Sequence, residues 1–280
     1  MKEKVSYIKS PLNYVGGKYK LLKEILPLFP DSINTFVDLF GGGFNVGINV
    51  SANKFIYNDI ESHVVELIKY MEENDIHKLL SEIDFLIDKY KLSKENSVGF
   101  TELRKYYNNE NNSPVVFYTL ICYAFNYQIR FNQNGEYNMP FGKSRSSFNL
   151  SLRKKFIEFV EELHNKSIRF SNVSFNEFNF NDLGNYDFVY CDPPYLNSTA
   201  SYNEKDGWTE NHERALLLCL DNLDKAGIRF ALSNNLKYDN LLLDTWKNKY
   251  NVHYLNGDYS NCNYHKIDRS KDIEVLITNY

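Results

Sequence analysis

The stretch Asp187–Tyr195 limits the possible folds of this chain more than any other part of the sequence. Its first five residues, Asp187–Cys191, have the apolar character of a strand that is buried on both faces of a sheet. The strand has to end there, because Asp192 is followed by two prolines, which have no N–H to donate to a ladder. Asp192 and Tyr195 are therefore expected at the carboxyl end of a strand, where open α/β sheets bind their ligands.

The tetrad Asp192-Pro193-Pro194-Tyr195 also indicates the chemistry of a ligand. It brings together one carboxylate, the rigid carbonyl of Pro193 and one flat ring. Two acceptors beside a ring suit a heterocycle that carries an exocyclic amino group, and the amino group of a nucleic-acid base is the obvious candidate. Taken alone, the tetrad would be interpreted as a strand that ends in a Pro-Pro turn and binds nothing, which is common.

A second strand pattern, Ile33–Leu39, leads into a loop with three consecutive glycines at positions 41–43. A helix of small and apolar residues between Val46 and Ala52 is expected next, and then a short strand, Lys54–Tyr57. Asp59 follows this strand and can accept hydrogen bonds from ribose hydroxyls. Glycines before a helix let an adenosine-containing ligand approach the backbone closely. The spacing is not G-x-G-x-x-G, so the loop alone does not separate NAD from S-adenosylmethionine, and a tight turn without a ligand stays open.

Residues 61–166 have helical periodicity instead of the alternating helices and strands around them. Helices are expected over His63–Glu73, Ile76–Tyr90, Pro114–Phe125 and Leu152–Leu163. Within Gln128–Asn138, the pair Asn134-Gly135 lies between alternating residues, which is typical of a β-hairpin. This region is therefore predicted to be a mainly helical insertion.

The α/β pattern lies on both sides of the insertion and forms the sheet. The expected elements are a helix through Leu21, Leu22, Ile25 and Leu26, strands Ile168–Phe170, Asp187–Cys191 and Ile228–Ser233, a helix Glu213–Ala226, and a closing strand Glu274–Tyr280. Together they predict an α/β fold with a Rossmann-like sheet formed by residues 1–60 and 167–280. The inserted domain is expected to span residues 61–166.

Charge and composition restrict the partners of such a protein. The 280 residues carry a net charge of −4, so a nucleic acid would have to be bound by a local basic patch. Five cations without an acid lie between positions 136 and 158, although a solvated helix face is the alternative reading; they are Lys143, Arg145, Arg153, Lys154 and Lys155. The cysteines 122, 191, 219 and 262 are far apart and suggest reduced core thiols rather than a metal site. No apolar run suggests a leader or a membrane span, so a soluble, cytoplasmic protein is expected.

In their order and combination, these motifs resemble the DNA adenine-N6 methyltransferase (Dam) family, of the type whose recognition region precedes the tetrad. The matching segments are Asn13-Tyr14-Val15-Gly16-Gly17-Lys18-Tyr19, Asp38-Leu39-Phe40-Gly41-Gly42-Gly43, Asn58-Asp59, Phe125-Asn126, Arg130-Phe131-Asn132, Gly135-Glu136-Tyr137-Asn138-Met139-Pro140-Phe141-Gly142, Asp192-Pro193-Pro194-Tyr195, Leu232-Ser233-Asn234 and Glu274–Tyr280. Three positions depart from the family pattern. Tyr14 stands where Trp is usual, Phe44 where a further glycine is common, and Lys143 where Arg is frequent.

The resemblance implies roles for particular residues. The expected catalytic residues are Asp192, Pro193 and Tyr195. The expected S-adenosyl-L-methionine-binding residues are Tyr14, Lys18, Asp38, Phe40, Asp59 and Asp192. The expected DNA-binding residues are Phe125, Asn126, Arg130, Asn132, Lys143 and Arg145. No metal is implied, and Cys191 is interpreted as a core thiol, because an amino nitrogen needs no thiolate to activate it.

The implied activity is direct transfer of a methyl group from S-adenosyl-L-methionine to the N6 amino group of adenine in duplex DNA, after base flipping. GATC is the family's commonest target and the expected one, although related enzymes with other targets share the scaffold. The protein is expected to act as a monomer in a bacterial or phage setting, with any restriction endonuclease a genetic rather than a physical partner. Three alternatives stay open: methylation of RNA or protein glutamine, a catalytically silent DNA-binding regulator, and a nicotinamide oxidoreductase.

Overall fold

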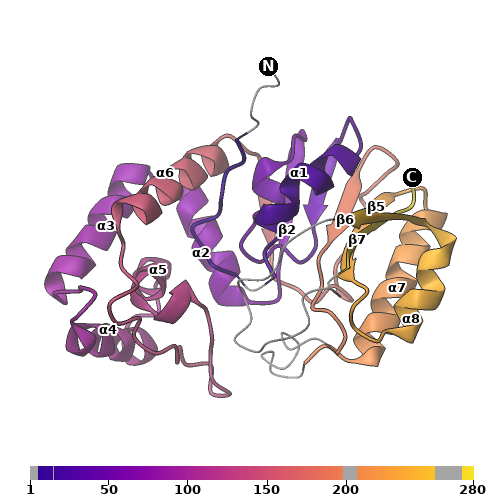
Figure 1. Cartoon of the computed structure of the whole chain (residues 1–280). Helices are drawn as coiled ribbons and strands as arrows, with labels where there is room; N and C mark the ends of the chain where they lie inside the picture. The colour runs from indigo at the N-terminus through magenta and orange to yellow at the C-terminus, as the bar shows by residue number, and fades with distance from the viewer. Residues whose placement is uncertain (1–5, 15, 198–206, 256–272) are drawn as a thin grey trace. The chain divides into compact units, whose positions relative to one another are not determined.

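The computed structural model describes residues 6–14, 16–197, 207–255 and 273–280. The chain divides into two compact units, each assembled from separate stretches of sequence. Unit 1 consists of Met1–Gly17, Gly42–Ile48 and Glu61–Lys166, and unit 2 consists of Lys18–Gly41, Asn49–Ile60 and Ser167–Tyr280. Unit 1 thus contains the helical stretch 61–166, and unit 2 contains the strands (Figure 1).

Within the described residues, unit 2 is built around one seven-stranded sheet of order β3-β2-β1-β4-β5-β7-β6. The strands are β1 (Thr35–Asp38), β2 (Lys54–Asn58), β3 (Ile168–Ser171), β4 (Phe188–Cys191), β5 (Arg229–Asn235), β6 (Asn251–Leu255) and β7 (Glu274–Thr278). The first five strands pair in parallel, and β7 is antiparallel to both β5 and β6. The predicted Rossmann-like α/β sheet is confirmed.

The strand order changes direction between β1 and β4. From β1 the chain continues outward to β2 and β3, whereas from β4 it continues to the other side, to β5. Asp38, the last residue of β1, lies opposite Tyr190 of β4, so both strands end at the same edge. Such a switch point leaves a crevice at the carboxyl ends of the strands, which is where ligands bind in this type of sheet.

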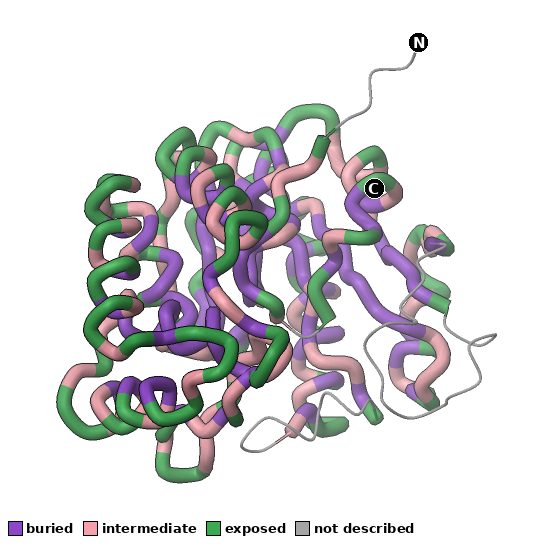
Figure 2. The backbone as a smooth tube through the Cα atoms, turned by 60° about the vertical axis from the view of Figure 1, so that its left-hand side comes forward, coloured by how far each residue is buried: buried purple, intermediate pink, exposed green. Residues whose placement is uncertain are grey.

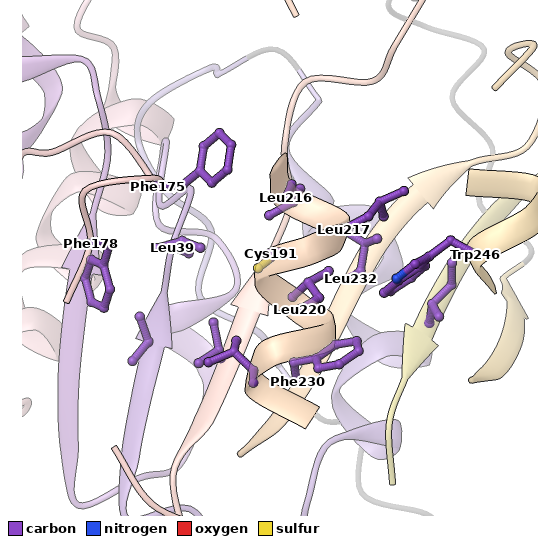
Figure 3. Packing of buried hydrophobic residues seen from close by; sticks show 14 of the residues in the cluster. Leu39, Phe175, Phe178, Cys191, Leu216, Leu217, Leu220, Phe230, Leu232 and Trp246 are labelled. Carbon is purple, nitrogen blue, oxygen red and sulfur yellow. The ribbon is translucent and has the colours of Figure 1, made fainter. Parts of the chain in front are cut away.

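One face of the sheet carries a large apolar cluster covered by α7 (Glu210–Lys225) and α8 (Leu241–Trp246). Figure 3 shows α7 directing leucines toward Cys191 of β4 and Leu232 of β5. Each fully buried leucine, isoleucine or phenylalanine side chain contributes roughly 1.5–3 kcal/mol to the stability of the folded state relative to an exposed one. The cluster therefore holds the strand ends in place. The inner strands β1, β2, β4, β5 and β7 are mostly buried, whereas the edge strands β3 and β6 are largely half-buried or exposed (Figure 2).

The opposite face is covered by a short helical segment and is rich in aromatic rings. The segment comprises η1 (Lys18–Leu21), α1 (Leu22–Ile25) and η2 (Leu26–Leu28), where only four residues are α-helical. Phe29, just after it, packs against Phe188 and Tyr190 with ring centroids 4.7 and 5.5 Å apart. This packing places the end of the helical segment on the same face of the sheet as Phe188 and Tyr190.

Two elements of unit 2 were not predicted, namely α8 and β6. The predicted helix between Val46 and Ala52 is wrong, since the only helical residues there are the 3₁₀ turn η3 (Gly47–Asn49). Phe44 explains the difference. Its backbone is left-handed, with φ of 58°, and its fully buried ring lies so close to Gly47 that a Cβ there would come within 2.0 Å.

Unit 1 is a helical bundle centred on α5 (Pro114–Tyr123), in which eight of ten residues are buried. Around it pack α2 (Ser62–Glu73), α3 (Ile76–Lys89) and α4 (Ser97–Asn109), while α6 (Leu150–His164) packs on α2 and α3. The helix α4 was not predicted, because Gly99 and several polar residues weaken its periodicity. Gly99 is needed there, since a Cβ would lie 2.0 Å from the Tyr90 carbonyl oxygen.

The predicted hairpin is present in unit 1. Phe131 and Tyr137 form an antiparallel bridge, and the Asn132 N–H donates to the Glu136 carbonyl at 2.9 Å. Gly135 has a φ of 78°, which glycine adopts at no steric cost. The hairpin is thus built by the turn residues that the sequence pattern indicated.

Cys122 and Cys191 are buried in the structure, and burial raises the pKa of both thiols, as expected of core cysteines. Cys219 is half-buried, and Cys262 lies outside the described residues. Among the described residues, no helix is long and apolar enough to span a bilayer.

Candidate functional site

The tetrad lies at the carboxyl end of β4, beside the end of β1. Asp192 is held there by Lys18, whose Nζ lies 2.6 Å from Oδ1 and 2.7 Å from Oδ2. The Lys18 side chain is only 3% exposed and that of Asp192 18%. Both charges are therefore largely removed from water, and each depends on the other for compensation.

Tyr195 completes the tetrad. Its hydroxyl lies 3.4 Å from Asp192 Oδ1 and 3.2 Å from Glu274 Oε2, and the Lys18 ammonium sits 5.2 Å from its ring centroid. The Tyr195 hydroxyl therefore lies between two carboxylates, and the Lys18 ammonium that pairs with Asp192 also lies within cation–π distance of the Tyr195 ring. Pro193, between them, is buried.

Burial raises the pKa of Asp192 above its ordinary value, and the Lys18 ammonium and the Tyr195 hydroxyl oppose part of this rise. Burial also raises the pKa of Glu274. Carboxyl groups with raised pKa values that lie at the edge of a sheet are typical of functional sites, because a purely structural fold gains little from burying them. The cluster has hydrogen-bond acceptors ready for a ligand with N–H groups.

The predicted cofactor residues of unit 2 line the same edge of the sheet. Asp38 ends β1 and is 2% exposed, and Asp59 follows β2 directly and is 8% exposed. Phe40 packs against Phe175 and Trp208, with ring centroids 5.6 and 5.8 Å apart. Carboxylates at the ends of β1, β2 and β4 are thus brought to one edge by the parallel register.

Gly41 allows the loop after β1 to run against the neighbouring strand. Its N–H donates to the Asn58 carbonyl at 2.8 Å, and a Cβ at this position would lie 2.3 Å from the ring of Tyr57. Tyr57 is fully buried and has no room to move aside. The glycine is therefore required by close packing rather than by an unusual φ.

Tyr14, the remaining predicted cofactor residue, belongs to unit 1. There its ring packs against the second and third glycines of the loop: a Cβ on Gly42 would lie 3.1 Å from the ring, and one on Gly43 would lie 3.4 Å from the Tyr14 Cβ. Gly42 has a φ of 47°. Tyr thus packs against the glycine loop at the position where the family usually has Trp, and Phe44 adopts the left-handed backbone that a glycine would favour.

Two of the predicted DNA-binding residues lie in the hairpin of unit 1 and differ in availability. Arg130 is exposed, and its Nε and one Nη donate to the Asn138 side chain and carbonyl at 2.8 and 3.1 Å. These bonds orient the guanidinium. The Asn132 side chain instead accepts from the N–H groups of Asn134 and Glu136 and donates to the Glu136 carboxylate at 2.7 Å. In this structure Asn132 shapes the turn, with its Oδ1 and one N–H of its amide bonded within the hairpin.

Phe125 and Asn126 lie in the loop after α5. Asn126 and Tyr127 both have left-handed backbones, with φ of 54° and 56°. Consecutive left-handed residues other than glycine are strained and occur mostly where function requires them. The Asn126 carbonyl accepts from the Asn13 side chain at 2.7 Å, and Phe125 donates its N–H to the Pro140 carbonyl.

The basic residues of unit 1 fall into two groups. Lys143 and Arg145 are exposed, on the loop after the hairpin. Arg153, in contrast, forms an ion pair with Asp84 and stacks over Phe148, and Lys154 lies 3.6 Å from Glu158. For Arg153 and Lys154, the solvated helix face is therefore the better interpretation.

Glu274 and Asn235 are site residues to which the sequence patterns assigned no role. The sequence indicated Glu274 only as the first residue of the closing strand. No pattern in the neighbouring residues indicates that an acid at this position belongs to a site. It becomes recognisable only through the antiparallel pairing of β5 and β7, which places Asn235 opposite Glu274.

The fold and the site together define a class. A parallel sheet with one antiparallel strand in this order, and an Asp-Pro-Pro-Tyr tetrad at its switch point, is the Rossmann-like sheet of S-adenosylmethionine-dependent methyltransferases. The sequence profile described as D12 class N6 adenine-specific DNA methyltransferase matches residues 14–261. The chain belongs to this family, which confirms the predicted resemblance.

Several curated proteins are similar to the chain. Type II methyltransferase M.FokI from Planomicrobium okeanokoites is 53% identical over 98% of this chain and 43% of its own length. Modification methylase StsI from Streptococcus sanguinis is 46% identical over the same shares. DNA adenine methylase from Escherichia coli K12 is 23% identical over 86% of this chain and 85% of its own length. The chain thus spans less than half of M.FokI and StsI.

One solved structure, the rRNA methyltransferase aviRa from Streptomyces viridochromogenes, aligns with 92% of this chain and 82% of its own, at 12% identity and a TM-score of 0.36. A similarity this weak adds nothing to the assignment.

Proposed function

We propose that this protein transfers a methyl group from S-adenosyl-L-methionine to the N6 amino group of adenine in duplex DNA. The observation that carries the proposal is the largely buried Asp192 carboxylate, held by Lys18 at the switch point of the sheet. Family membership and the similarity to proteins named as adenine methylases support it. An Asp at the head of the tetrad favours a base amine over protein glutamine, for which related enzymes usually carry Asn.

The chemistry of the edge suits the cofactor. Asp59 would accept hydrogen bonds from its ribose hydroxyls, and Asp38, Phe40 and Lys18 would contact its other parts. A contact of Tyr14 with the cofactor stays a prediction from the resemblance. Bound S-adenosyl-L-methionine would supply an electrophilic methyl group on a sulfonium. The protein's own residues would bind and orient the adenine amino group that attacks this methyl group.

The amino nitrogen of adenine is a poor nucleophile, because its lone pair is delocalised into the ring. Asp192 would accept one of its N–H bonds and the Pro193 carbonyl the other, which favours a pyramidal nitrogen with its lone pair available for attack. Each carboxylate oxygen has more than one lone pair, so Asp192 can accept this bond while it remains paired with Lys18. Tyr195 would stack on the base, which must leave the duplex to be reached.

Unit 1 would supply recognition of the DNA, with residues 61–166 as the target-recognition domain. Arg130 would read a base edge, because its guanidinium is exposed and oriented by Asn138. Phe125 would wedge between base steps and Asn126 would contact a base or the backbone, while Lys143 and Arg145 would hold phosphates. Asn132 would act indirectly, by shaping the hairpin. GATC, expected from the resemblance alone, stays a prediction, as do monomeric action and a genetic link to a restriction endonuclease.

The direct test is methyl transfer to DNA by the wild type and by Asp192→Ala. Purified protein with tritiated S-adenosyl-L-methionine is expected to label plasmid DNA but not RNA, and nucleoside analysis is expected to find N6-methyladenine. Asp192→Ala should lose transfer by at least a factor of about 100, since such acceptors commonly contribute that much. Single-molecule sequencing of the same plasmid reads the target. Label in RNA or protein, or full activity in the variant, would refute the proposal.

A further inference from the structure

Glu274 is a buried carboxylate that touches the tetrad without belonging to it. It is 3% exposed, and both of its oxygens accept hydrogen bonds: Oε1 from the Asn235 amide at 2.7 Å and Oε2 from the Tyr195 hydroxyl at 3.2 Å. Burying an acid is costly, and burial raises its pKa. A carboxylate kept in this place therefore has a task beyond filling the core.

The task follows from the number of protons on the Tyr195 hydroxyl. This group has one proton to donate, and among the described residues two carboxylates lie within its reach, Glu274 at 3.2 Å and Asp192 at 3.4 Å. The shorter distance directs the proton toward Glu274. A hydroxyl that donated to Asp192 instead would occupy an acceptor site on Oδ1 and would draw electron density from the carboxylate that has to accept the substrate amine.

Asn235 fixes which atom of Glu274 faces the tyrosine. The Asn235 Oδ1 accepts from the N–H groups of Lys237 and Ile273, so its amide nitrogen has to point toward Glu274. A glutamine at position 274 would turn its oxygen to this nitrogen, and its NH₂ group would then face Tyr195. The tyrosine would lose its acceptor and would donate to Asp192.

We propose that Glu274 is a positioning residue for the methyl transfer proposed above, on which this inference rests. It draws the Tyr195 hydroxyl proton away from Asp192, which keeps the acceptor oxygen available to the amine and holds the ring in its stacking position. The effect acts through one hydroxyl group. Removing that hydroxyl should therefore remove the need for Glu274.

The test is a double-mutant cycle with Glu274→Gln, Tyr195→Phe and the double variant, measured as methyl transfer to plasmid DNA. Glu274→Gln is expected to lower kcat about tenfold, which corresponds to about 1.4 kcal/mol, with the KM for DNA changed less than about twofold. In the Tyr195→Phe background, the same substitution is expected to change kcat by less than about twofold. If Glu274→Gln leaves kcat unchanged, or lowers it equally in both backgrounds, the inference is overturned.

Asp187→Asn is the matched control. Asp187 is another buried acid of unit 2, but it precedes β4 at the opposite edge of the sheet and accepts from Asn34, Thr35 and Gly184. Its substitution should destabilise the protein while leaving kcat per folded molecule unchanged. If it lowers kcat as Glu274→Gln does, the effect at Glu274 is a general consequence of instability and the inference fails.

The four proteins of the cycle, namely the wild type, Glu274→Gln, Tyr195→Phe and the double variant, also separate this inference from the proposed function. If the wild type methylates no DNA, the proposed function fails, and the midpoints of urea unfolding then decide on Glu274. A midpoint shift by Glu274→Gln that disappears in the Tyr195→Phe background supports the contact, whereas equal shifts refute it. If Glu274→Gln does not fold, Glu274→Asp replaces it, because the shorter side chain keeps the charge and withdraws the acceptor from Tyr195.

Discussion

Replacing Lys18 by methionine tests the electrostatic core of the site. Methionine has nearly the same length and volume as lysine but no charge, so the substitution removes the ammonium that now bonds both oxygens of Asp192 at 2.6 and 2.7 Å. Asp192 would be left as a carboxylate in a largely buried place. The folded state should lose stability, and the loss should depend on pH.

The size of the loss follows from the burial of the pair. Removing one partner of a buried ion pair costs about 3–5 kcal/mol when the other partner stays charged. The Asp192 side chain retains 18% exposure, so water reaches it in part and the lower end, about 3 kcal/mol, is expected at pH 8. At lower pH the carboxyl can take up a proton, which reduces the loss by up to about 1.4 kcal/mol for each unit by which its folded-state pKa is raised.

The sign of the pH dependence follows from the direction of the pKa shift. Burial already raises the pKa of Asp192, and the Lys18 ammonium opposes this rise, so Lys18→Met should raise the pKa further. A folded-state pKa above the unfolded value of about 3.9 means that the folded protein binds the extra proton. The stability of the variant should therefore fall as the pH rises from about 4 through the raised pKa.

Urea unfolding of the wild type and Lys18→Met between pH 5 and pH 8 checks this. The difference in unfolding free energy should be smaller at pH 5 than at pH 8, and the double variant Lys18→Met, Asp192→Asn should recover most of the stability. Lys20→Met, which removes an exposed lysine from the same 3₁₀ turn, is the control and should cost less than about 1 kcal/mol. An equal loss at both pH values, or an equal loss in the control, would show that the ion pair does not dominate.

Two further predictions concern the glycine loop and the basic patch. Gly41→Ala should destabilise the protein by about 1–3 kcal/mol in urea unfolding, because the new Cβ would lie 2.3 Å from the Tyr57 ring. Gly184→Ala is the control: a Cβ at position 184 would have no atom within 4 Å, so the substitution should be neutral or slightly stabilising. Arg145→Ala should reduce the slope of log affinity against log salt by about one in DNA-binding titrations, and Arg153→Ala should leave the slope nearly unchanged, because Asp84 already neutralises Arg153. Equal slopes for the two arginine variants would contradict the assignment of phosphate contacts.

Most of the sheet could be predicted because its signals are local. Apolar runs that stop at a proline or a glycine mark strands such as β1 and β4, and the pair Asn134-Gly135 marks a hairpin, since these residues restrict the backbone wherever they occur. The elements that were missed lack such signals. Gly99 interrupts the pattern of α4 but is required by the Tyr90 carbonyl, and the left-handed Phe44 replaces the predicted helix after the glycine loop by a single 3₁₀ turn.

The candidate site divides in the same way. A single sequence sufficed to indicate a tetrad that ends a buried strand, an acid after the next strand and a loop of glycines, because each depends on a few adjacent residues. The partners of these groups depend on tertiary structure. Lys18 reaches Asp192 across 174 positions, Glu274 meets Tyr195 only because β7 pairs antiparallel with β5, and Asn132 hydrogen-bonds within its own turn. The local backbone conformation depends on residues that are adjacent in the sequence, so the sequence alone predicts it. The pairing of buried charges depends on the strand register, which brings side chains together that are distant in the sequence.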